Sequence, residues 1–191
     1  CDGDAWRPIY TPPKNGQSQA QAGQTCETLL TNGFNAGNAI YWIDPGGGSS
    51  DDAFQAYCDM TTDGGGWTLL GTISGADANQ WNAEPGLWGT SGVVGSINQL
   101  TLDYKSRAWN ELDITGAEVI YQRLYDGQIK AQVKFASDCQ GNKKFFRDIF
   151  STWDTGISCG PGSVQALTIA TDSAGLAGGT YIEGTDAVFG P

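Results

Sequence analysis

Apolar and polar residues alternate along residues 54–58, and this period of two predicts a half-buried β-strand. A glycine-rich run over residues 63–66 follows, and glycine adopts the positive backbone dihedrals that a sharp chain reversal needs. The apolar run resumes with Trp67, Leu69 and Leu70, so we expect a strand, a glycine turn and a second strand. A phosphate-binding loop is excluded, because no Gly-Lys-Ser/Thr follows the glycines and the next residues favour a strand over a helix.

The residues before this hairpin predict a helix and one further strand. Residues 25–32 are expected to form a short helix, because a threonine can cap its start and an Asn-Gly pair can end it. Residues 39–44 carry the apolar pattern of a strand. Residues 1–24 are polar and rich in turn residues, which is typical of an arm or a linker. Its apolar side chains, Trp6 among them, would dock either on the arm's own domain or on a neighbouring subunit.

Further elements are expected along the second half of the chain. Residues 74–100 have the composition of a loop. Two alternating runs, 118–124 and 128–136, flank an Asp-Gly turn and predict a β-hairpin. Residues 143–153 place apolar residues at helical spacing, which predicts a helix whose stripe packs in the core. Residues 163–170 predict a last strand.

Length and composition indicate one domain with much ordered loop. The chain has 191 residues, 28 of them glycine, and only 16% are charged. A chain of this length can bury a hydrophobic core, and the glycine content is about twice the usual value. We expect an α+β domain over residues 25–191, preceded by the arm. Its first unit, 25–73, would be pinned by a disulfide, and 74–191 would hold the central sheet and a divergent C-terminal part.

The net charge of −11 excludes some partners. The chain has too few lysines and arginines to neutralise a run of phosphates, which argues against nucleic acid and against anionic membrane surfaces. Divalent cations or neutral ligands fit better, and the simpler alternative is that the charge only maintains solubility. No apolar run reaches the roughly 20 residues of a membrane span. The chain begins at Cys1 rather than at methionine, so we expect it to be processed or excised.

Five cysteines and no histidine point to disulfides rather than zinc. From their spacing, we expect Cys26 to pair with Cys58 and Cys139 to pair with Cys159. This pairing predicts an oxidising environment, either extracellular or at the cell surface. Cys1 is left over: it would pair between chains, carry a lipid, or mark the boundary of an excised segment.

A motif in the first hairpin carries a family resemblance. Residues 57–60, Tyr-Cys-Asp-Met, and 64–68, Gly-Gly-Gly-Trp-Thr, resemble the core motif of fibrinogen-like domains, in particular their intelectin-like and bacterial branches. The same family places a cysteine in an early helix, then Tyr-x-Ile-Asp-Pro, found here at 41–45. An Asp-Tyr-Lys-Ser segment at 103–106 extends the likeness. The resemblance implies a fibrinogen C-terminal-like fold, a twisted and mainly antiparallel sheet with short helices and long ordered loops, and the pairing of Cys26 with the Tyr-Cys-Asp cysteine.

The likeness fades after Cys139. The Asp-x-Asp calcium loop and the Gly-Gly-Trp-Trp stretch of many animal members are missing from the sequence. The C-terminal lobe, where the family's ligand pockets lie, is therefore expected to be shortened or cut off.

Enzymatic activity is not expected. Without histidine, neither a Ser-His-Asp nor a Cys-His arrangement can form. Nothing in the sequence singles out a carboxylate pair for glycoside hydrolysis.

Calcium is the better cation candidate, because it needs only oxygen ligands and tolerates irregular loops. The intelectin-like site corresponds here to Ser74, Gly75, Asp77 and Asp103. Those relatives use a His and a Glu of the loop as ligands, and the corresponding residues here are Ser74 and Gly75. Backbone carbonyls, or an acidic residue later in the chain, would therefore have to complete the site. The late acids are Asp172, Glu183 and Asp186. The alternative is that these residues only shape a loop and a turn.

The resemblance also implies carbohydrate binding, with a glycan or a cell-surface glycoconjugate as the partner. Aromatic rings that could stack on sugar faces are Trp81, Trp88 and Trp109, although tryptophans more often anchor a core. We therefore expect an extracellular, non-enzymatic, lectin-like module. The alternative is a structural or assembly module of a surface filament or oligomer, associating through the arm or Cys1.

Overall fold

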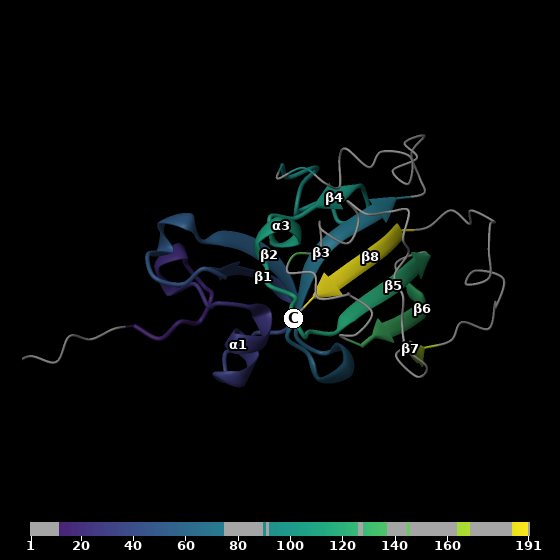
Figure 1. Cartoon of the computed structure of the whole chain (residues 1–191), viewed down its shortest axis with the longest axis horizontal. Helices are drawn as coiled ribbons and strands as arrows, with labels where there is room; N and C mark the ends of the chain where they lie inside the picture. Colours follow the sequence, from purple (N-terminus) through teal and green to yellow (C-terminus); the bar gives the residue numbers. More distant parts are fainter. Residues whose placement is uncertain are drawn as a thin grey trace, which may run out of the picture.

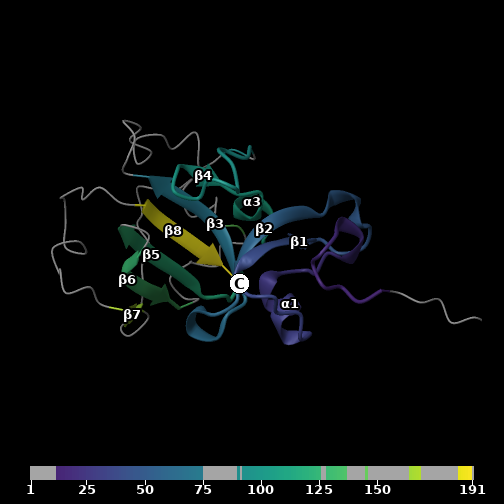
Figure 2. The ribbon, with the colours of Figure 1, turned by 180° about the vertical axis from the view of Figure 1, so that it is seen from behind.

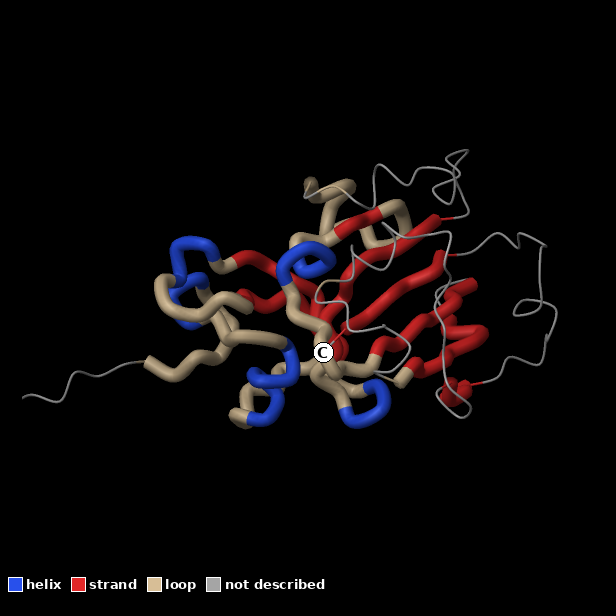
Figure 3. Tube along the Cα trace, in the orientation of Figure 1, coloured by secondary structure: helices blue, strands red, loops and turns tan. Residues whose placement is uncertain are grey.

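Eight strands form one sheet in the part of the chain that the structure describes. The computed structural model describes residues 12–74, 90, 92–125, 128–136, 145, 164–168 and 185–190. The strands are β1 Ala39–Ile43, β2 Phe54–Asp59, β3 Trp67–Ser74, β4 Tyr104–Lys105, β5 Val119–Tyr125, β6 Gln128–Phe135, β7 Val164–Thr168 and β8 Thr185–Gly190 (Figure 1). The helices are α1 Cys26–Thr31 and α3 Ala108–Glu111, with single 3-10 turns at η1 Gln19–Gln21, η2 Ser50–Asp52 and η3 Thr62–Gly64 (Figure 3).

The last described strand lies in the middle of the sheet. The strand order is β1-β2-β3-β8-β5-β6-β7, with β4 paired to β3, and every pair of strands is antiparallel. Figures 1 and 2 show β8 between β3 and β5 from both sides. The N-terminal hairpin and the β5–β6 hairpin are therefore joined into one sheet through β8.

The mainly antiparallel sheet with short helices confirms the expected fold class in its coarse form. The predicted early helix, the two strands of the first hairpin, the β5–β6 hairpin and the strand at β7 are all present. The elements β4, α3 and β8 were not predicted. The helix expected over 143–153 falls outside the described residues, apart from Phe145.

The strand β3 is buried on both faces, which explains its continuous apolar run. Leu70 belongs to a core that β3 shares with α1, β1, β2 and α3. The neighbouring Leu69 belongs to a second core on the other face, together with Trp67, Ile120 and Phe189. Adjacent residues of a strand point to opposite faces, so β3 organises both layers.

The first hairpin needs its glycines for close contact as well as for the reversal. Asp63, Gly64, Gly65 and Gly66 all have positive φ. A Cβ atom at Gly65 would lie 2.2 Å from the carbonyl oxygen of Met60. One at Gly66 would lie 2.8 Å from the Cα atom of Glu27 in α1. The glycine run therefore lets the turn fold onto its own backbone and lets α1 approach it.

The carboxylate of Asp59 holds the start of this turn together. It accepts hydrogen bonds from the backbone N–H groups of Thr61 (2.9 Å) and Thr62 (3.0 Å), and from both threonine hydroxyls. The carbonyl oxygen of Thr62 in turn accepts the indole N–H of Trp67 at 2.8 Å. Burial opposes ionisation of Asp59, but these hydrogen bonds outweigh it and hold its pKa below the usual 3.8.

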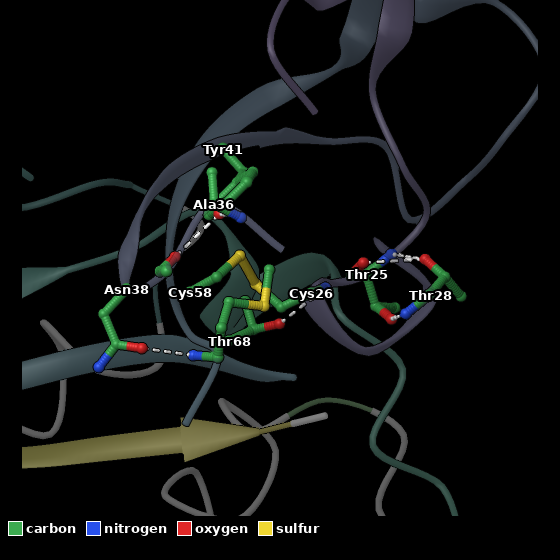
Figure 4. The surroundings of a disulfide bond; sticks show 10 residues. Thr25, Cys26, Thr28, Ala36, Asn38, Tyr41, Cys58 and Thr68 are labelled. Carbon is green, nitrogen blue, oxygen red and sulfur yellow. Dashed lines mark hydrogen bonds between the residues drawn. A yellow bond between two sulfur atoms is a disulfide. The ribbon is translucent and has the colours of Figure 1, made fainter. Parts of the chain in front are cut away.

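A disulfide joins α1 to β2. Cys26 and Cys58 form the expected pair, with both side chains fully buried and their Cα atoms 5.5 Å apart (Figure 4). Thr25 caps the helix in a reciprocal capping box with Thr28. Closing a loop of this size stabilises the fold by roughly 3–4 kcal/mol in the chain-entropy model. Cys1, Cys139 and Cys159 lie outside the described residues.

The described part of the N-terminal arm lies along β1 of the same chain. The N–H of Trp42 donates to the carbonyl oxygen of Gly16 at 2.8 Å. Gly23 accepts the N–H of Asp44 at 2.6 Å and donates to the carbonyl of Trp42 at 3.2 Å. Residues 16–23 thus dock on their own domain, while residues 1–11 are outside the described part.

We expect Gly65→Ala to destabilise the domain much more than Gly64→Ala. Both positions have positive φ, which costs an alanine about 1–2 kcal/mol. Only at Gly65 does the added methyl meet a backbone atom, whereas nothing lies within 4 Å of a Cβ at Gly64. Urea unfolding should show a loss of about 3 kcal/mol or more for Gly65→Ala. Equal losses in the two variants would contradict the close approach.

We expect Asp59→Asn to abolish a pH-dependent part of the stability. A carboxylate whose folded pKa is lowered stabilises the fold above its unfolded pKa of about 3.8, and this contribution is lost as the pH falls through the folded value. The free-energy difference between the wild type and Asp59→Asn should therefore be large near about pH 7 and shrink below about pH 4. A Thr62→Val control, which removes one donor, should show a smaller effect of the same sign. An unchanged difference across this range would rule out the proposed role.

Candidate functional site

Two of the four residues expected to bind calcium meet at the end of β3. Ser74 is the last residue of β3, and Asp103 directly precedes β4, which pairs with β3. The backbone N–H of Ser74 donates to Oδ1 of Asp103 at 2.7 Å. Both residues are buried, at 3% and 9% exposed. Gly75 and Asp77 lie outside the described residues.

The approach of two backbone segments fixes the position of Asp103. The hydroxyl of Thr72 donates to the carbonyl oxygen of Leu102 at 2.7 Å. On the other side, Gly95 has φ +69°, and a Cβ there would lie 2.0 Å from the carbonyl oxygen of Asp103. Only glycine allows this contact, so the loop before β4 holds the carboxylate against the end of β3.

A fully buried lysine lies beside this site, and no pattern in the sequence predicts a role for it. The ammonium group of Lys105 donates to the carbonyl oxygen of Thr90 at 2.6 Å and to its hydroxyl at 3.3 Å. Burial lowers the pKa of Lys105. Its backbone also pairs with Val94 in both directions. Lys105 therefore ties the end of the preceding loop to β4. No sequence signal identifies Thr90 as its partner.

The site offers oxygen ligands, which suit a hard cation. The strand β8 adds a further acid to this end of β3, because the register pairs Asp186 with Ile73 and Thr185 with Ser74. Asp172 and Glu183 are outside the described residues. Within the described ranges, no group of three or more His, Cys, Asp or Glu side chains could hold a metal ion. Calcium requires about six to eight oxygens, so the described residues would supply only part of a site.

Trp109 occupies the core rather than a surface. It lies in α3 with 1% of its surface exposed and packs over Gly71, with ring atoms 3.5 Å from the place of a Cβ on that glycine. The ring presents no face to a ligand, in line with the core alternative. Trp81 and Trp88 are outside the described residues.

No helix among the described residues combines the length and apolar character needed to cross a membrane.

The model of the fibrillar collagen C-terminal domain matches residues 9–145, more than two thirds of the chain. No curated protein matches the sequence.

Two solved structures are similar to the chain at a low level. The fibrinogen-like globe domain of human ANGPTL6 is 15% identical with a TM-score of 0.41, covering 60% of this chain and 49% of that one. The fibrinogen-like globe domain of human ANGPTL2 is 18% identical with a TM-score of 0.41, covering 59% and 49%. The chain spans about half the length of both, and we draw no inference from either likeness.

The family match corrects three expectations and confirms two others. The assignment to the fibrinogen-like family was wrong, because the matching family is a different one. The lectin-like function and the glycan partner that depended on that assignment are overturned with it. The absence of enzymatic activity and the extracellular location are properties of the matched family and are confirmed. The family is also known to bind calcium.

Proposed function

Because the chain belongs to the family of fibrillar collagen C-terminal domains, we propose that it is an extracellular assembly module that directs the association of chains into trimers. The observation that carries this proposal is the family match over residues 9–145. It favours the structural alternative that the sequence had left open.

The architecture is suited to such a role. A module that brings chains together needs a preformed surface, since ordering flexible segments on binding lowers affinity. Here the disulfide between α1 and β2, the docking of residues 16–23 on β1 and the two-sided burial of β3 all restrict internal motion. The fold therefore supplies a scaffold that needs little rearrangement before it associates.

Charge imposes a condition on this assembly. Each chain carries a net charge of −11, so copies of it repel one another at low ionic strength. Cations bound to acidic side chains would reduce this repulsion between copies. Assembly of an acidic chain is thus expected to depend on divalent cations.

For the cation we propose calcium, with Asp103 and Ser74 among its ligands. The support is the 2.7 Å hydrogen bond that brings these two residues together and the oxygen chemistry of the site. Gly75, Asp77 and Asp186 are the candidates that would complete the coordination.

The oligomeric state tests the assembly proposal directly. Light scattering coupled to gel filtration should give a mass of about 61 kDa, three times the 20.2 kDa of one chain, in buffer with calcium. The same measurement on a Cys1→Ser variant separates covalent from non-covalent association. A strictly monomeric protein at about 0.1 mM with calcium would contradict the proposal, since weak specific interfaces associate in this range.

Calcium should stabilise the wild type and should not stabilise Asp103→Asn. Calcium at about 100 times its Kd adds about 2.7 kcal/mol of stability, which for a domain of this size raises the Tm by about 5 °C or more. Asp51→Asn, which alters an exposed carboxylate in η2, is the control and should keep the full shift. Equal shifts in the wild type and Asp103→Asn would place the metal elsewhere.

A further inference from the structure

The outer edge of β1 is covered by the N-terminal arm of the same chain. Among the described strands, β1 pairs only with β2 and ends the strand order of the sheet. On its other side, Trp42 donates its backbone N–H to the carbonyl oxygen of Gly16 at 2.8 Å and accepts the N–H of Gly23 at 3.2 Å. Gly23 and Ile43 form a parallel β-bridge, and Figures 1 and 2 show the arm, in purple, beside β1. The arm therefore supplies backbone partners that a neighbouring strand would otherwise supply.

A hydrogen bond within the arm brings both of its anchor residues to β1 together. The backbone N–H of Gly16 donates to the carbonyl oxygen of Gln21 at 2.8 Å, and the 3-10 turn η1 reverses the chain between them. Gly16 and Gly23 are both buried, as is Ala22. The arm thus meets the strand as one closed loop rather than as an extended tail.

Close packing on α1 holds this loop in place. Leu29 of α1 is fully buried beneath the arm. A Cβ atom at Gly23 would lie 2.5 Å from Cδ2 of Leu29 and 2.6 Å from its Cγ. One at Gly16 would lie 2.9 Å from Cδ1 of the same leucine. The backbone of the arm therefore contacts α1 directly, and glycine is the residue that fits at both anchors.

The strand beneath the arm has a composition that favours pairing with another strand. Its sequence, Ala-Ile-Tyr-Trp-Ile, contains no charge, glycine or proline and is rich in β-branched and aromatic residues. Tyr41 and Ile43 are buried in the first core, whereas Ile40 and Trp42 are half-buried and belong to neither core of the described residues. An uncharged, apolar strand with an unpaired edge is a template for pairing between chains.

We propose that residues 16–23 act as a strap that prevents the outer edge of β1 from pairing with the same edge of a second copy of this chain. Two β1 strands can pair antiparallel about a two-fold axis, because such a contact uses the same surface of both copies. The pairing would also bring together the half-buried side chains of Ile40 and Trp42 from both copies. The strap occupies the same backbone groups of Trp42, so the two pairings exclude each other. Displacement of the strap, or cleavage within it, converts the domain into a self-associating form.

Gly23→Val tests the strap in the full chain. Gly23 does not have positive φ, so the added side chain acts through its clash with Leu29. Light scattering in calcium-free buffer should give this variant about twice the mass of the wild type or more at the same concentration. Gly92→Val is the matched control, because Gly92 is exposed, also lacks positive φ, and has 4.0 Å of space around its Cβ position. It should keep the mass of the wild type.

A second substitution shows whether the association uses β1. Ile40→Lys places a charge on the edge strand at a half-buried position outside both cores, and a lysine there opposes pairing between copies. Gly23→Val combined with Ile40→Lys should return to the mass of the wild type. In this double variant the amide of Trp42 should exchange with solvent about tenfold or more faster than in Ile40→Lys alone, because its bond to Gly16 is lost. If Gly23→Val fails to fold, Gly16→Ala loosens the strap from its other anchor and takes its place.

The proposal is overturned if the strap variant keeps the mass of the wild type up to about 0.1 mM. It is also overturned if the double variant stays associated, because the contact then lies elsewhere, or if exchange at Trp42 is unchanged, because the arm then does not hold that edge. Every comparison is with the wild type in the same calcium-free buffer. The outcome therefore does not depend on whether the wild type forms trimers, and the assembly proposal stands or falls separately.

Discussion

The close approach of backbone to backbone in the first hairpin is the constraint on which the fold depends. Gly65 lies against the carbonyl of Met60, and Gly66 lies against Glu27 of α1. These contacts place α1 where Cys26 can reach Cys58, and the disulfide then fixes a geometry that the glycines allow. The strand that follows, β3, carries both cores on its two faces. A side chain at Gly66 would push α1 away from the sheet that it helps to cover, and one at Gly65 would force the turn away from Met60.

Local patterns in the sequence predicted most elements near this hairpin. The capped helix α1 and the alternation of β2 and β5–β6 are short-range signals, and the structure contains all of them. The strand β8 was missed because its residues, Thr-Asp-Ala-Val-Phe-Gly, show no clear alternation and its partners lie far away in the sequence. The 3-10 turn and the hydrogen bonds around Asp59 explain why the reversal is wider than a two-residue turn.

The family was misassigned for a physical reason. The Tyr-Cys-Asp and triple-glycine motifs reflect how a hairpin packs against a helix. A shared packing arrangement of this kind does not identify the function of the chain. Of the residues expected to bind calcium, the register of β3 and β4 brings Ser74 next to Asp103. The burial of Lys105, its contact with Thr90 and the core position of Trp109 depend on tertiary packing, which spacing along the chain does not reveal.

The position of β8 has a consequence for synthesis. A ribosome makes the chain from its N-terminal side, so β3 and β5 emerge before β8, the strand that pairs with both. Until Thr185–Gly190 arrives, each of these strands presents an open edge, and open edges invite pairing between different nascent chains. For an assembly module this order matters, because premature contacts would join chains through the wrong surfaces. The native surface of this sheet therefore forms only once β8 has been made, when β8 covers the open edges of β3 and β5.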